Sequence, residues 1–176
     1  MTSVPQTDVW LRGPVAGVPS ELQPVAHAFL QLLEDIEKIA PALGQEELWF
    51  RPGGAASIGF HLTHMSGSID RLFTYARGKE LSATQSNAFE NERRLEPPLP
   101  TSAELVSRLR HTIESGLQQL RLTEPGSLLE PRPVGRAKLP STVLGLLFHA
   151  AEHAQKHTGQ IITTAKIVRE SADTGF

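Results

Sequence analysis

Apolar residues recur at every third or fourth position along four stretches of the chain, which is the period of an amphipathic helix. The first stretch spans residues 20–39 and starts with Ser20 and Gln23, which are placed like a capping box. The second spans residues 56–77 and is followed by Gly78, a favourable residue at a helix C-terminus.

The third stretch begins at Thr101, where Thr101 and Glu104 provide both halves of a capping box. The fourth begins near residue 141 or 142 and continues to Val168. Because no segment alternates between apolar and polar residues with period two, the pattern predicts an all-α protein with four long helices.

The connections between these stretches differ in length. Residues 45–50 are expected to form only a short turn, whereas residues 79–100 and 123–140 are long, polar and rich in proline. Connections of this length are crossovers or functional segments. Glu92, Arg93 and Arg94 in the first of them are expected to lie on the solvated surface. We expect one domain over residues 20–170, preceded by an extended N-terminal segment, residues 1–19.

Composition excludes several classes of function. The 176 residues are 39% hydrophobic and 20% charged, an ordinary globular profile, and the net charge of −2 does not indicate a nucleic-acid or membrane partner. The chain has no cysteine, so disulfides and thiolate metal sites are excluded and His, Asp and Glu remain as ligands. Residues 1–19 lack the pattern of a secretion signal, and no apolar run is long enough to span a membrane, so we expect a cytoplasmic protein.

Candidate chemistry is concentrated in the last helical stretch, where His149, His153 and His157 follow one another at intervals of four residues. Residues four apart lie on one side of a helix, so two of these imidazoles can bind one metal ion. The spacing alone does not decide between the pair 149/153 and the pair 153/157. A third ligand must come from another helix, and the second stretch offers His61 and His64, of which His64 lies in the apolar stripe. The alternative is that the histidines only pack and hydrogen-bond in the core.

The last helix resembles those of the DinB-like superfamily of small bacterial helical bundles. The similarity rests on His149, then Glu152-His153, three residues, and His157-Thr158-Gly159-Gln160-Ile161. The segment "SIGFHLTHMSGSIDRLFTYARG", residues 57–78, resembles the second helix of the same family. The similarity covers most of residues 20–168.

The resemblance implies a four-helix bundle with an up-down-down-up path, which fits the two long crossover connections. It also implies one divalent metal ion, most often nickel or zinc, bound by three histidines. By position in the motif, the ligands are His64, His153 and His157. Many such bundles pair through their helices, so the resemblance allows a homodimer, but nothing in the sequence selects a face.

Neighbouring polar residues receive weaker roles. His149, one turn before His153, could contact a metal ligand or only pack, and we expect it to pack or hydrogen-bond. His61 is open to the same two interpretations, contact with a ligand or packing. Glu152 is expected to orient a partner on the first or third helix. The remaining expectations are a bundle-face position for His27, a surface position for His111, close helix contact at Gly159, and capping of a buried polar group by Gln160.

For function, the resemblance implies a metal-dependent enzyme of the thiol S-transferase type, which joins a low-molecular-weight thiol to an electrophile. Such a reaction needs no protein cysteine, and the catalytic residues stay unknown. A metal-dependent hydrolase is a second possibility, and a non-catalytic metal- or ligand-binding stress protein is a third. An accessible cleft at the metal, lined by residues 79–100 and 124–140, would favour an enzyme.

Overall fold

The chain forms an all-helical domain, as a computed structural model shows for residues 7–94 and 96–174, with side chains described up to residue 170. The all-α prediction is confirmed, since no β-strand occurs among these residues. The long helices are α1 (Gln23–Ile39), α3 (Ile58–Ala76), α5 (Ser102–Leu122) and α6 (Val143–Thr174). The shorter elements are α2 (Gln45–Trp49), α4 (Ala83–Asn91), and the 3-10 helices η1 (Val9–Leu11), η2 (Ser20–Leu22), η3 (Ala40–Ala42), η4 (Pro52–Gly54) and η5 (Pro125–Ser127).

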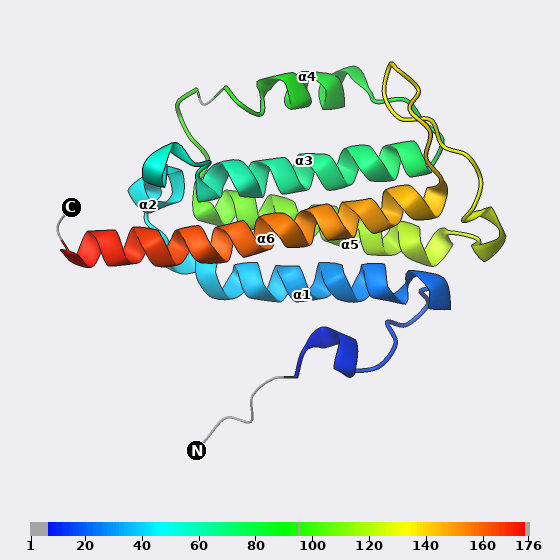
Figure 1. Cartoon of the computed structure of the whole chain (residues 1–176), viewed down its shortest axis with the longest axis horizontal. Coiled ribbons are helices and arrows are strands. Elements are labelled where there is room, and N and C mark those ends of the chain that lie inside the picture. The colour runs from blue at the N-terminus through cyan, green and yellow to red at the C-terminus, as the bar shows by residue number, and fades with distance from the viewer. Residues whose placement is uncertain (1–6, 95, 175–176) are drawn as a thin grey trace.

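The four long helices lie lengthwise beside one another (Figure 1), and α3 and α1 each pack against both α5 and α6. Their apolar stripes meet in one continuous core. Phe29 on α1 is fully buried, and its ring lies 5.7 Å from that of Phe73 on α3. Each large side chain buried in this way contributes about 1.5–3 kcal/mol. Burial of the helix stripes, rather than helix propensity, therefore fixes the arrangement.

Two of the predicted helix starts had different outcomes. The capping box at Thr101 and Glu104 is confirmed, with both hydrogen bonds formed at the start of α5. The box at Ser20 and Gln23 is wrong, because Ser20 begins the 3-10 helix η2 and its hydroxyl donates to Glu21. The Gln23 side chain instead bonds to backbone atoms of Val15 and Val18, which holds the preceding segment against the start of α1.

The long connection over residues 79–100 contains α4, a helix that the sequence analysis did not expect. It starts at a capping box between Ser82 and Gln85 and runs along α3 (Figure 1). The connection over residues 123–140 has no α-helix; it contains η5 and two isolated antiparallel bridges, Pro131 to Thr142 and Val134 to Leu139.

The part of the N-terminal segment that the structure describes lies along α1 (Figure 1). The backbone N–H of Val9 donates to Gln31 at 2.9 Å, and Arg12 forms an ion pair with Glu34. Residues 1–6 of the segment lie outside the described residues. Within the described ranges, no helix combines the length and the apolar composition that crossing a membrane requires.

Candidate metal centre

The structure brings together the three histidines that the family pattern selects. His64 comes from the middle of α3, and His153 and His157 come from adjacent turns of α6. The Nε2 atoms of His64 and His153 are 2.9 Å apart, and those of His153 and His157 are 3.2 Å apart. One nitrogen from each residue lies within 4.8 Å of the other two, so the group has the dimensions of a metal-binding site. Of the two helical pairs, it is 153/157 that lies close to His64 in the structure.

His64 is fixed by contacts on both sides of its ring. Its Nδ1 lies 2.8 Å from Oε2 of Glu92, and the ring stacks on Phe60 with centroids 5.7 Å apart. The other carboxylate oxygen of Glu92 accepts a hydrogen bond from Arg71. The expectation that Glu92 lies on the solvated surface is wrong, because it is buried with 9% of its surface exposed. Glu92 directly follows α4 in the chain, and the course of α4 along α3 brings Glu92 into contact with α3.

His157 has a partner on α3 as well. Its Nδ1 lies 3.0 Å from Nδ1 of His61, which is buried with 5% of its surface exposed. Of the two interpretations left open for His61, the structure favours contact with one of the clustered histidines. His61 is therefore a fourth histidine at the cluster: it contacts Nδ1 of His157, whereas His153 lies near Nε2 of the same ring.

The protonation states of the cluster suit metal binding. A carboxylate only accepts hydrogen bonds, so Nδ1 of His64 donates to Glu92, and its Nε2 is the nitrogen that faces the other histidines. Burial, together with the charges of His153, His64 and His61, lowers the pKa of His157 to about 4. Burial and the charge of His64 also lower the pKa of His153. These imidazoles are consequently neutral at pH 7, which is the form that coordinates metals.

The spacing of the nitrogens also fits a single ion. Ligand nitrogens at about 2.0–2.1 Å from a tetrahedral zinc lie roughly 3.3 Å from one another. The observed separations of 2.9 and 3.2 Å are close to this value. Neutral nitrogens this near to one another repel unless a proton or a cation lies between them. The donor set is therefore compatible with one divalent ion and one open position.

Next to the cluster, Glu92 and Arg71 form a buried ion pair in which Glu92 stays charged. Burial alone would raise the pKa of Glu92, but the hydrogen bonds from His64 and Arg71 outweigh burial and lower it. The carboxylate therefore stays ionised beside His64. The Arg71 guanidinium lies 4.3 Å above the ring of Phe89, a cation–π contact that adds to its fixation.

The remaining histidines lie outside the cluster. His149 is exposed, and its Nδ1 is 3.0 Å from Oε2 of Glu152. The expected partner for Glu152 on the first or third helix is thus replaced by a residue of its own helix. His27 bonds to the carbonyl of Gly13, and His111 is exposed on α5, as the sequence analysis expected.

Two expectations about the end of the motif have different outcomes. Close helix contact at Gly159 is wrong, because a Cβ atom at this position would meet no atom within 4 Å. Gln160 is exposed on α6, and its side chain acts to raise the pKa of His157, so it interacts with a histidine of the cluster.

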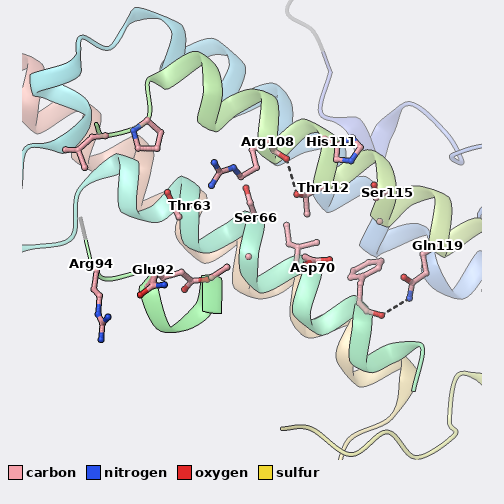
Figure 2. Close-up of a pocket in the computed structure, with 18 of the residues that line it drawn as sticks. Thr63, Ser66, Asp70, Glu92, Arg94, Arg108, His111, Thr112, Ser115 and Gln119 are labelled. Atoms are coloured by element: carbon pink, nitrogen blue, oxygen red, sulfur yellow. Dashed lines mark hydrogen bonds between the residues drawn. The ribbon is translucent and has the colours of Figure 1, made fainter. Parts of the chain in front are cut away.

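A cavity of about 520 Å³ lies between α3, α5 and the chain that follows α4. Figure 2 shows Thr63, Ser66 and Asp70 of α3 facing Arg108 and Thr112 of α5 across this space. Its lining includes Glu92 but none of the three clustered histidines. The chain after residue 123 contributes instead to another cavity, near Arg132 and Val143. The two loops therefore line different cavities here, and neither cavity is lined by the clustered histidines.

Sequence reasoning missed the pair formed by Arg71 and Glu92. One local signal was present: Ser82 and Gln85 have the spacing of a capping box, which predicts α4 and places Glu92 at its end. A second signal was Arg71 itself, a charged residue within a largely apolar helix. Which residue it meets depends on how α4 folds back, and no local pattern reports this.

Comparison with known proteins agrees with the fold. A crystal structure of a conserved protein from Enterococcus faecalis has a TM-score of 0.65 and 16% sequence identity, covering 85% of this chain and 97% of that one. At this identity the similarity shows the fold alone. None of the curated proteins compared with the chain matches it significantly. The family profile of the DinB superfamily matches residues 21–161, a range that includes α1 to α5 and all three clustered histidines. The chain belongs to the DinB superfamily.

Proposed function

We propose that the protein binds one divalent metal ion, nickel or zinc, through Nε2 of His64, His153 and His157. The observation that carries this proposal is the convergence of three imidazole nitrogens within 4.8 Å, two of them on adjacent turns of α6. The lowered pKa values of His153 and His157 support it, because protons compete weakly for these nitrogens at neutral pH.

We further propose that the metal site serves an enzyme of the thiol S-transferase type. A metal ion on three histidines keeps a position open and lowers the pKa of a thiol or water that occupies it. The chain has no cysteine of its own, so the thiol comes from outside the chain, and a small-molecule thiol is part of this proposal. In the transfer, the sulfur bonds to the electrophilic carbon, the leaving group departs with the electrons of the broken bond, and the thiol proton passes to solvent.

The protein residues in this proposal bind and orient. His64 is held by Glu92 and stacked on Phe60, and His157 is held by His61, so two of the three ligands have fixed ring planes. Partial burial of the cluster limits the access of water. Fixed ligand geometry of this kind lowers the cost of ordering the site when the metal binds.

A non-catalytic role in metal or ligand binding is the second candidate. The observation that favours it is the position of the 520 Å³ cavity, whose lining omits His64, His153 and His157. A substrate held there would contact Glu92 but none of the three histidines that would hold the metal. Hydrolysis by the same metal site remains the enzyme alternative to thiol transfer.

The architecture completes the proposal. The colour gradient of Figure 1 runs in one direction along α1 and α6 and in the other along α3 and α5, which supports an up-down-down-up four-helix bundle. We propose residues 20–170 as its single domain. A cytoplasmic location, a small-molecule thiol or electrophile as partner, and a homodimer are parts of the same proposal. A net charge of −2 argues against nucleic acid as a partner.

The test is a thiol-consumption assay with metal-reconstituted protein. Nickel- and zinc-loaded wild type would be incubated with a panel of low-molecular-weight thiols and a haloalkyl electrophile, beside His153→Ala as control. Faster thioether formation with wild type alone supports the transferase. Bound metal without acceleration for any thiol, and without hydrolysis of ester or amide substrates, supports the non-catalytic role.

A further inference from the structure

We propose that Glu92 is a positioning residue of the metal site, delivered by α4 to hold the His64 ring with Nε2 directed at His153 and His157. The inference rests on the proposed function, because its consequence is tighter metal binding. It assigns a role to α4, which otherwise appears only as part of a polar crossover.

α4 is anchored to α3 at both of its ends. Near its start, Gln85 Nε2 donates to Asp70 Oδ2 and to Thr74 Oγ1, each at 2.8 Å. At its end, Glu92 accepts from Arg71 and from His64. Figure 2 shows Glu92 where the chain leaves α4, beside α3. Two anchors at opposite ends fix the helix along α3 and so define where the Glu92 carboxylate lies.

The surface of α3 has a space that admits the Glu92 carboxylate. A Cβ atom on Gly67 would lie 2.4 Å from Oε1 of Glu92 and 2.7 Å from a guanidinium nitrogen of Arg71. These distances are too short for any real contact. Gly67 is therefore the residue that lets the ion pair lie flat against the helix, one turn after His64.

Glu92 is directed at the ring of His64 but not at the metal position. Its Oε2 contacts Nδ1, whereas Nε2 of the same ring faces His153 at 2.9 Å. The two carboxylate oxygens have separate partners, since Arg71 takes one and His64 takes the other. The carboxylate thus fixes the proton on Nδ1 and leaves the lone pair on Nε2. Outer contacts of this kind are worth about 10–100-fold in metal affinity.

The experiment compares wild type with Glu92→Gln, Glu92→Ala and Gly67→Ala. Two controls match them. Glu90→Gln makes the same charge change at an exposed position of α4, and Gly159→Ala makes the same helical substitution where a Cβ meets nothing within 4 Å. Zinc affinity is measured by competition with a chromogenic chelator. The tautomer of His64 is determined from long-range ¹H–¹⁵N spectra of the metal-free proteins, and thermal melts confirm that each variant is folded.

We expect Glu92→Ala and Gly67→Ala to weaken zinc binding by about 10–100-fold. We expect a smaller loss for Glu92→Gln, whose amide oxygen can still accept from Nδ1. His64 should be in the Nδ1–H tautomer in wild type and both controls, and should lose this preference in Glu92→Ala. If Glu92→Ala does not fold, the zinc affinities of Glu92→Gln and Gly67→Ala test the same inference.

Two results would overturn the inference and are distinct from failure of the proposed function. Equal zinc affinity in wild type and in all folded variants leaves the metal site in place but removes the role of Glu92. An Nε2–H tautomer of His64 in the metal-free wild type would contradict the inference that Glu92 fixes the proton on Nδ1. If wild type binds no zinc or nickel, the proposed function fails, and the tautomer measurement alone decides whether Glu92 orients His64.

Discussion

Acid should destabilise the metal-free protein through His157, and the sign follows from its environment. The pKa of His157 falls from its ordinary value of 6.5 to about 4 in the folded chain. At pH 7 the imidazole is neutral in both states. As the pH falls below 6.5, the unfolded chain takes up a proton that the folded chain refuses, so the free energy of unfolding decreases until about pH 4.

The size of the effect follows from the same interval. Each pH unit over which only the unfolded chain is protonated costs about 1.4 kcal/mol, which sets a limit of roughly 3.4 kcal/mol. Partial contact of the ring with solvent reduces the effect, and we expect about 1.5–2 kcal/mol between pH 7 and pH 4.

The assay is urea unfolding in the presence of a chelator at a series of pH values, for wild type and His157→Gln. The substitution removes this titration and leaves the other groups, so the difference between the two pH profiles isolates His157. Wild type should lose about 1.5–2 kcal/mol more than the variant on acidification. If the free energies of unfolding of wild type and His157→Gln change in parallel with pH, His157 titrates alike in the folded and the unfolded chain, and this prediction is refuted.

Three further predictions concern the core, the end of the motif and the metal. Phe29→Ala should lower the free energy of unfolding by about 3–5 kcal/mol in urea titrations, because the fully buried ring packs on Phe73; a loss below about 1 kcal/mol would contradict this core. Gly159→Ala should raise the free energy of unfolding by about 0.5–1 kcal/mol, because the new methyl meets no atom within 4 Å. A lower free energy of unfolding would show that α6 has no room for a methyl group at this position. In a chelator titration, zinc affinity should fall by less than about tenfold between pH 7.5 and pH 6, because the pKa values of His153 and His157 are lowered, whereas two ordinary histidines would cost about tenfold or more.

The sequence predicted the helices well where the signal was local. Thr101 and Glu104 marked the start of α5 because a capping box needs only residues three apart. The same pattern failed at Ser20, where Gln23 turns to the backbone of the preceding segment instead. Tertiary contacts of this kind compete with local capping and cannot be read from spacing.

The grouping of the three histidines could be predicted from the sequence, but the residues that surround them could not. Helical spacing allowed the pairs 149/153 and 153/157, the apolar stripe of the second helix pointed to His64, and the family pattern selected 153/157. The role of Glu92 depends on a contact 28 residues away in sequence, formed only when α4 folds along α3. A charged residue in a polar segment looks like solvated surface until that path is known.

The account depends most directly on whether the protein holds a metal ion on α3 and α6. The decisive measurement is metal content by mass spectrometry on protein prepared without an affinity tag, for wild type, His153→Ala and His149→Ala. The account predicts about one equivalent of a divalent metal in wild type and in His149→Ala, where the exposed imidazole hydrogen-bonds to Glu152 and is not one of the three clustered histidines, and none in His153→Ala. No metal in wild type after reconstitution with nickel or zinc, or equal metal in His153→Ala, would contradict it.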